Sequence, residues 1–190
     1  MISNYKGEKF PDNLTSLLLE SERMAAEIKN NLINAPTLGE LYHYDDTSKK
    51  VFRQKEKFPP LICNSKLSSK HKSDNEIMGL YIFGEPIDNT VEPVYVGITR
   101  TIYRRLKQHG WGKWHNQCTL AYIMANKHYH NNEFDKSRKD LPERELDDMK
   151  KKLRKHHVMI IPVDLDYELY FLEVALAGLL ETKWNSFRTH

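Results

Sequence analysis

Apolar residues recur along this chain with two periods, one helical and one typical of strands. Between residues 14 and 32 they return every three or four positions with charges between them, which predicts an amphipathic helix. Asp12 and Asn13 are suited to begin that helix, and Ala35-Pro36 ends the pattern. We expect the helix to pack on the core of the protein; a dimerisation or DNA-framing helix is the alternative.

Three short segments rich in β-branched and aromatic residues predict strands, at residues 78–83, 93–98 and 158–163. A polar stretch with glycine and proline, residues 84–92, separates the first two, so we expect a hairpin with a loose loop. Tyr81 and Tyr95 lie fourteen residues apart in these two strands. Antiparallel pairing would place both phenols on one face of the hairpin.

Helical patterns surround the predicted strands. The first begins at Thr99 or Thr101 and stops at Gly110. Others cover residues 117–126, 141–155 and the segment up to residue 180, for which Asp164 or Asp166 is the expected cap. The sequence therefore predicts an α+β fold, with a small three-stranded sheet in a β-β-α-β-α core flanked by helices.

The region between the first helix and the hairpin carries weaker signals. Leu38 to Tyr44 suggests another helical turn, and periodicity fades from Asp45 to Asn75. This second segment holds eight lysines and arginines against four acidic residues. It is either a basic, weakly ordered arm that follows a phosphate backbone or a solvated linker. Residues 58–62 interrupt it with an apolar patch that we expect to dock on the core.

Composition narrows the class of protein. With 190 residues the chain is long enough for one core with an appended arm. Its formal charge of +3 is too mild to identify a partner by itself. The two cysteines, Cys63 and Cys118, give no disulfide framework. The first six residues lack the apolar core of a signal peptide, and no apolar run approaches the ~20 residues that a membrane span needs, so we expect a soluble, cytoplasmic protein.

Glu173 stands out in the last predicted helix. From Leu169 to Leu180 all the residues except Glu173 are apolar or glycine. An unpaired buried polar group costs about 1–3 kcal/mol, so this carboxylate needs a positive partner. That partner is either a core arginine or a metal ion at the floor of a cleft. Glu168 lies about 140° around the helix and faces elsewhere.

Taken together, these residues resemble the GIY-YIG nucleases. The GIY element corresponds to Gly79-Leu80-Tyr81 and the YIG element to Tyr95-Val96-Gly97. The helical arginine of that family matches Arg105, ten residues after Tyr95, and its metal-binding glutamate matches Glu173, twelve before Asn185. The resemblance covers residues 78–185. It implies a nuclease domain at 78–190 preceded by a helix and basic arm at 1–77.

The resemblance also implies a chemistry. Glu173 would hold Mg²⁺ (or Mn²⁺), and Arg105 would donate hydrogen bonds to the scissile phosphate. Tyr81 would accept a proton from the attacking water, with Tyr95 and His109 lining the pocket and Asn185 fixing its edge. His109 is a possible proton relay because histidine ordinarily titrates near neutrality. Many relatives carry a lysine where this chain has Ile98. Deprotonation of the tyrosine with the help of a lysine is therefore not expected here, and His109 is the preferred residue for proton transfer.

The resemblance favours one function among three. A histidine at position 109 is more like the restriction-enzyme members, so we expect a Type II endonuclease acting as a homodimer on double-stranded DNA. The alternatives are a repair, phage or mobile-element nuclease of low specificity, and a silent domain that only binds nucleic acid. Further DNA contacts are expected at Trp111, Lys113, Arg100 and Arg104. A zinc site at His128, His130, His156 and His157 lacks the usual spacings and is set aside.

Overall fold

The computed structural model of the chain describes residues 3–58 and 76–187. The chain forms two compact units. Unit 1 comprises Met1–Ala35, Pro59–Ile102 and His157–His190, and unit 2 comprises Pro36–Phe58 and Tyr103–His156. Each unit therefore draws on segments from both sides of residue 78, and the division into 1–77 and 78–190 stays a prediction about function.

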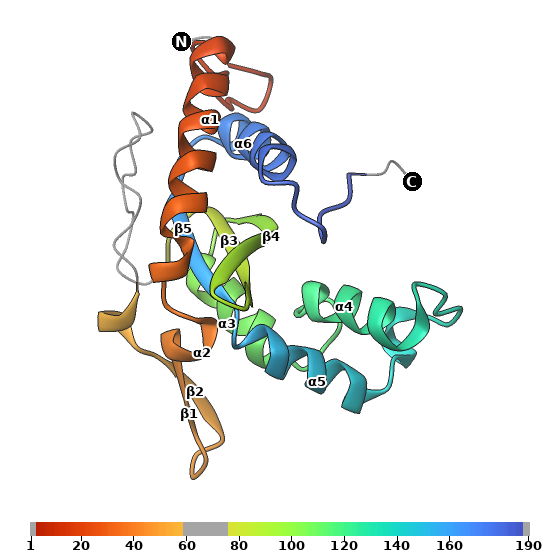
Figure 1. Cartoon of the computed structure of the whole chain (residues 1–190). Coiled ribbons are helices and arrows are strands. Elements are labelled where there is room, and N and C mark those ends of the chain that lie inside the picture. The colour runs from red at the N-terminus through yellow and green to blue at the C-terminus, as the bar shows by residue number, and fades with distance from the viewer. Residues whose placement is uncertain (1–2, 59–75, 188–190) are drawn as a thin grey trace. The chain divides into compact units, whose positions relative to one another are not determined.

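Unit 1 is built on a three-stranded antiparallel sheet, as the sequence predicts. Its strands are β3 (Gly79–Ile87), β4 (Thr90–Thr99) and β5 (His157–Pro162), in the order β4-β3-β5 (Figure 1). The predicted loose loop is wrong, because both strands extend into it and only Asp88 and Asn89 form the turn. Asp88 adopts a φ of 51°, a left-handed conformation that aspartate tolerates better than most residues.

One face of the sheet carries the core of unit 1. Leu80 and Ile82 of β3 and Val96 of β4 are fully buried there, in a cluster with apolar residues of two helices. These helices, α1 (Leu14–Asn31) and α6 (Asp166–Leu179), lie side by side (Figure 1). The expectation that the first helix packs on the core is thus confirmed.

The ends of these helices follow sequence signals only in part. The Asn13 side chain accepts a hydrogen bond from the Ser16 N–H and caps α1, as predicted. At the other helix the prediction is wrong, because Leu165 takes the cap position without a side-chain bond. The Asp166 carboxylate instead accepts two hydrogen bonds of 2.9 Å from the Arg100 guanidinium, so the first turn of α6 is tied to the end of the hairpin.

Unit 2 is mainly helical. Its longer helices are α3 (Ile102–Trp111, whose first residue belongs to unit 1), α4 (Thr119–His130) and α5 (Glu143–Leu153), and α4 packs against α5. The predicted stop at Gly110 is wrong by two residues. Gly112 closes α3 by donating its N–H to the Gln108 carbonyl at 2.7 Å. A Cβ at Gly112 would come within 2.5 Å of that carbonyl oxygen, so only glycine fits there.

The described part of the expected basic arm has regular structure, contrary to prediction. The turn of helix is α2 (Leu38–Leu41), followed by a hairpin of β1 (Tyr42–Asp45) and β2 (Lys50–Arg53) and a short 3₁₀ helix, η2 (Lys55–Lys57). Asp45 stabilises the hairpin turn by accepting the N–H of Thr47 and the hydroxyl of Ser48. The rest of the arm, with the apolar patch beyond Phe58, lies outside the described residues.

Brief 3₁₀ helices also occur at η1 (Leu32–Asn34) and η3 (Arg138–Asp140).

Within residues 3–58 and 76–187, none of the helices has both the length and the apolar character that crossing a membrane would require.

Candidate active site

The two motif tyrosines contact each other on one face of the sheet in unit 1. Tyr81 lies opposite Gly97 in the strand register and Phe83 lies opposite Tyr95. The rings of Tyr81 and Tyr95 have centroids 6.2 Å apart, so the predicted side-by-side arrangement is confirmed. This face is opposite to the one that packs on α1 and α6, because side chains alternate along a strand. Tyr81 is only 1% exposed.

Gly97 allows the ring of Tyr81 to lie across β4. A Cβ at this position would come within 2.4 Å of both the Cζ and the Oη atoms of Tyr81 and within 2.8 Å of the Tyr95 ring. The hydroxyl end of Tyr81 is therefore directly above the backbone of the neighbouring strand. Gly79 has a comparable role on the β5 side, since a Cβ there would meet the Ile161 carbonyl at 2.2 Å. The glycines of both motifs are thus required by close packing.

Asn185 holds the outer edge of β4. Its Oδ1 accepts the Val96 N–H and its Nδ2 donates to the Val96 carbonyl, both at 2.8 Å. The Thr182 hydroxyl donates to the same Oδ1, which orients the amide. Val96 lies between Tyr95 and Gly97, so Asn185 fixes the strand that carries one tyrosine and supports the other. Its observed contacts are structural.

Glu173 occupies the core side of α6, on the same helical face as the buried Leu169 and Leu176. Burial raises the pKa of Glu173 to about 7. Among the described residues nothing forms a hydrogen bond or ion pair with its carboxyl group. The core-arginine alternative therefore has no support in the described part of unit 1. The group is partly exposed, so its ionised form can be reached at neutral pH.

Arg105 lies in unit 2, on α3, and is held by backbone carbonyls. Its Nη1 donates to the Gln117 carbonyl at 3.0 Å and more weakly to that of Asn116 at 3.4 Å. In the part of the chain that the structure describes, no carboxylate pairs with it. A guanidinium fixed by neutral acceptors keeps its full charge and has donors left for an anion.

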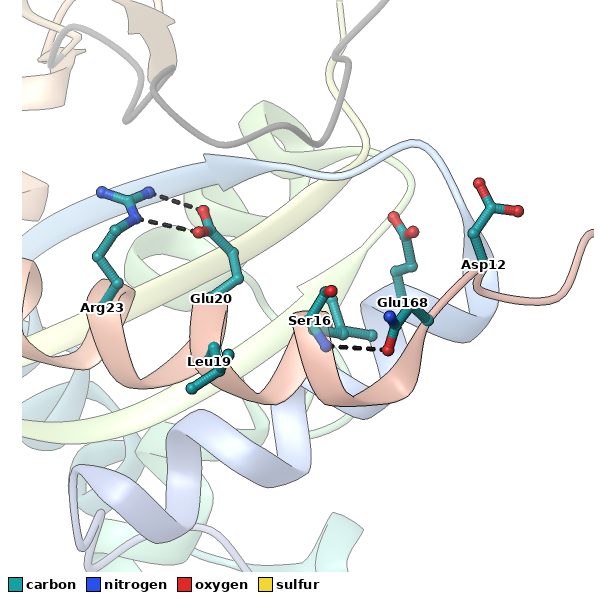
Figure 2. A pocket seen from close by; sticks show the side chains of 8 residues that line it. Asp12, Ser16, Leu19, Glu20, Arg23 and Glu168 are labelled. Atoms are coloured by element: carbon teal, nitrogen blue, oxygen red, sulfur yellow. Dashed lines mark hydrogen bonds and ion pairs between the residues drawn. The ribbon is translucent and has the colours of Figure 1, made fainter.

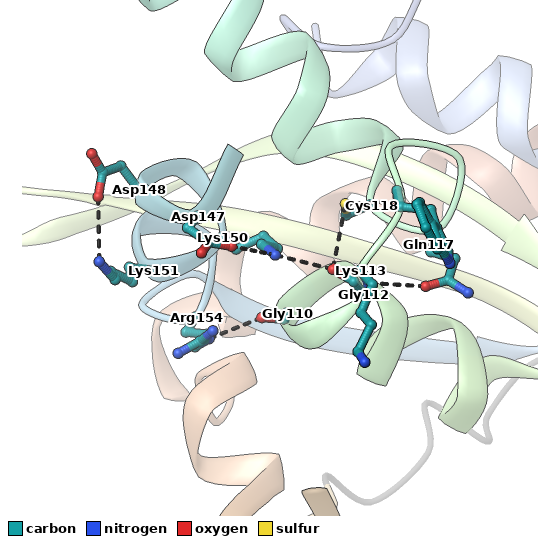
Figure 3. A network of polar contacts seen from close by, with 11 residues as sticks. Gly110, Gly112, Lys113, Gln117, Cys118, Asp147, Asp148, Lys150, Lys151 and Arg154 are labelled. Carbon is teal, nitrogen blue, oxygen red and sulfur yellow. Dashed lines mark hydrogen bonds and ion pairs between the residues drawn. The ribbon is translucent and has the colours of Figure 1, made fainter. Parts of the chain in front are cut away.

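The loop that holds Arg105 is itself fixed by cations of α5 (Figure 3). Lys150, 7% exposed, donates to the Gly112 carbonyl at 3.0 Å and pairs with Asp147. Arg154 donates to the Gly110 carbonyl at 2.9 Å. Cations at the carbonyl end of a helix are favourable because that end carries partial negative charge. Sequence analysis missed both residues, which bear no motif and lie more than forty residues from Arg105.

His109 shares a face of α3 with Arg105 but is fully buried. Burial, and to a smaller extent the Arg105 charge, lowers the pKa of His109 well below its usual value. The imidazole is therefore neutral at pH 7 and does not titrate in the neutral range. His109 is therefore not suited to relay a proton at neutral pH.

The further DNA contacts expected from the sequence have varied surroundings. Trp111 packs with its ring 5.6 Å from that of Tyr42 and 4.8 Å from the Arg154 guanidinium carbon. Arg100 is paired with Asp166. Lys113 and Arg104 are exposed. Trp114, which the sequence analysis did not select, is 65% exposed, whereas Trp111 is half-buried.

A separate hollow of about 550 Å³ lies beside the start of α1 (Figure 2). Its described lining includes Asp12, Glu20 and Glu168, with Arg23 paired to Glu20, and no predicted catalytic residue. Burial raises the pKa of Glu168, and Asp12 and Asp164 raise it further. Glu168 and Glu173 thus have different neighbours, as the sequence analysis expected from their angular separation.

The described residues contain no group of three or more histidine, cysteine or acidic side chains arranged to hold a metal ion. The histidines set aside for zinc have other contacts. His130 pairs with Glu145 at 2.7 Å, and a ring nitrogen of His157 lies 2.6 Å from the Ala35 carbonyl. A single carboxylate such as Glu173 is still enough for Mg²⁺, which keeps several waters and takes phosphate oxygens as further ligands.

The predicted site residues thus fall into two groups. Tyr81, Tyr95 and Asn185 meet around β4 in unit 1, which also contains Glu173. Arg105 and His109 are neighbours on α3 in unit 2. Convergence of the two groups on one phosphate stays a prediction. No family model, curated protein or solved structure was found to match this chain.

Proposed function

We propose that this chain is a metal-dependent endodeoxyribonuclease of the GIY-YIG type, and that it cleaves double-stranded DNA at specific sites as a Type II restriction homodimer. The observation that carries the proposal is the Glu173 carboxyl group. It is partly buried, has no cationic partner among the described residues, and has a pKa near 7. Such a group is costly in a purely structural role and suits a divalent cation.

Other features of the two units support the same chemistry. Tyr81 and Tyr95 are packed over Gly97, where the Cβ of any other residue would displace their rings. Arg105 is preorganised by the carbonyls of its loop and has no carboxylate to neutralise it in the described residues. Preorganised donors of this kind contribute most where negative charge develops during a reaction.

In the proposed mechanism Glu173 would hold Mg²⁺ or Mn²⁺, which would supply Lewis-acid stabilisation of the scissile phosphate and of the leaving oxygen. Arg105 donates hydrogen bonds to the non-bridging oxygens as their charge increases. Tyr81 would accept the proton of the attacking water as its phenolate, and a nearby cation would have to stabilise that form. His109 is a poor base for this step because it is fully buried and its pKa is lowered well below the usual value. Tyr95 packs against the Tyr81 ring and orients it.

The test is cleavage of plasmid DNA by the purified protein with Mg²⁺ or Mn²⁺. We expect discrete fragments, no cutting in the presence of a chelator, and no cutting by Glu173→Ala. Glu168→Ala is the matched control, because it removes a carboxyl group from the same helix but from different surroundings.

Each other outcome has a definite meaning. A smear or nicking would replace the restriction enzyme with a nuclease of low specificity. Binding without cleavage under any metal would favour a silent nucleic-acid-binding domain. Normal turnover by Glu173→Ala would refute the assignment of Glu173 as the metal ligand.

A further inference from the structure

The loop between α3 and α4, residues 112–118, presents an indole to solvent from a fixed backbone. The carbonyl of Trp114 accepts the N–H of Gln117 at 2.9 Å, the N–H of Cys118 at 3.2 Å and the Cys118 thiol at 3.0 Å. The indole itself is 65% exposed and has no ring or hydrogen-bond partner among the described residues. The backbone is therefore ordered while its largest side chain is unused by the fold.

The same loop is directly connected to the arginine assigned to the phosphate. Arg105 donates to the Gln117 carbonyl, and the Lys113 N–H donates to the Gln117 side chain at 3.0 Å. The side chain of Lys113 extends away from this network (Figure 3). The fixed guanidinium of α3 thus binds the backbone of the loop that carries an exposed ammonium and an exposed indole, all within unit 2.

The charge distribution of the chain identifies the class of ligand. Unit 2 has 19 lysines and arginines against 11 acidic residues, a formal charge of +8, whereas unit 1 has 10 against 15, or −5. From Pro93 to Asn132 there are six basic residues and no aspartate or glutamate. This acid-free stretch contains α3, the loop and all of α4. A polyanion is the partner that such a surface favours.

We propose that Trp114 stacks on a base of the DNA substrate while Lys113 contacts a flanking phosphate, next to the phosphate bound by Arg105. This inference rests on the proposed function. Indole rings stack on bases of any sequence, and apolar side chains inserted at a base step unstack it and kink the duplex. A rigid loop loses little conformational freedom on binding, which makes the contact efficient.

The experiment measures binding of a fluorescein-labelled 30-base-pair duplex by anisotropy, in the presence of chelator so that no cleavage occurs. Trp114→Ala should weaken binding by about 5- to 50-fold, and Trp114→Phe should retain most of it. Lys113→Ala should reduce the slope of log affinity against log salt by about one. DNA should quench tryptophan emission in the wild type and much less in Trp114→Phe. Phe52→Ala, which removes a half-exposed aromatic side chain of β2 in the same unit, is the control and should bind normally.

Unchanged affinity of Trp114→Ala overturns the inference. So does a change in sedimentation of Trp114→Ala without a change in DNA binding, which would mean that the indole covers a second copy of the chain. Equal binding of duplex RNA would overturn the assignment to DNA. Wild-type protein that binds through Trp114 but never cuts with metal would refute the nuclease and leave this contact in place.

Discussion

Both units bury an ionisable group, with opposite consequences. In unit 1, burial raises the pKa of Glu173 to about 7, so the ionised form is available near neutrality. In unit 2, burial and Arg105 lower the pKa of His109, so the imidazole stays neutral. Desolvation favours the uncharged form of each. The comparison shows that a carboxyl group held near its titration point is a candidate for cation binding, whereas a fully buried neutral histidine is part of the packing.

The largest effect should separate two nearby arginines, Arg105 on α3 and Arg100 just before it. Arg105→Ala in unit 2 should lower the cleavage rate by about 10²–10³-fold, the range seen when a preorganised donor to a developing charge is removed. Arg100→Ala in unit 1 loses only an exposed ion pair with Asp166 and should change the rate little. Single-turnover cleavage measures both. Equal losses would show that the charge on this segment matters and not the position of the guanidinium.

The next effect concerns two glycines of unit 1. Gly97→Ala should destabilise the fold by about 1–3 kcal/mol and impair cleavage, because the added methyl displaces the Tyr81 ring. Gly178→Ala on α6 has open space around the new methyl and should be neutral or stabilise by up to ~1 kcal/mol. Denaturant unfolding compares them. If Gly97→Ala were as stable and active as the wild type, Tyr81 would not need its observed position.

A smaller effect should appear in the pH dependence of unit 1. Because the pKa of Glu173 is higher in the folded state, the folded protein loses stability as pH rises from about 4.5 to 7. Glu173→Gln should therefore become the more stable protein across that window, by about 1–2 kcal/mol after allowance for solvent screening of a partly exposed group. Unfolding at pH 5 and pH 8 checks this. The same difference at both pH values would mean that the carboxyl group does not titrate as inferred.

The smallest effect should appear at acid pH and in unit 2. Since the pKa of His109 is lowered by folding, the wild type should lose stability as pH falls below the ordinary value of about 6.5. His109→Gln should lose less stability than the wild type between pH 7 and pH 5. His128→Gln, at an exposed site on α4, is the control and should follow the wild type. Melting temperatures at the two pH values provide the measurement.

The sequence predicted the elements that bury one face and missed those that do not. The long helix at 14–32, the three strands and the tyrosine pair follow from periodicity and register. The hairpin of β1 and β2 was missed because its strands are only four residues long and no residue in them except Tyr42 is buried. The cap of α6 was missed because Asp166 pairs with Arg100, a contact between residues far apart in sequence.

The candidate site was predictable as a set of residue types but not as a set of environments. Spacing alone selected Arg105, yet the carbonyls that hold it carry no side-chain signature. Spacing also placed His109 beside Arg105 but did not reveal its complete burial. Trp111 and Trp114 are equivalent in a sequence window, and only packing distinguishes the indole beside Tyr42 from the one in solvent.

The hydrogen bonds that Asn185 and Trp184 form with β4 have a consequence for aggregation. β4 is an edge strand, and the open edge of a sheet is a template for the strand of another molecule. Asn185 occupies the N–H and carbonyl of Val96, and the Trp184 N–H occupies the carbonyl of Val94. The chain thus shields its own border with two residues that are not themselves a strand. Cleavage of the polypeptide before Trp184 would leave these backbone groups of the β4 edge without their partners. Pairing of β4 with a strand of another molecule would then be favoured.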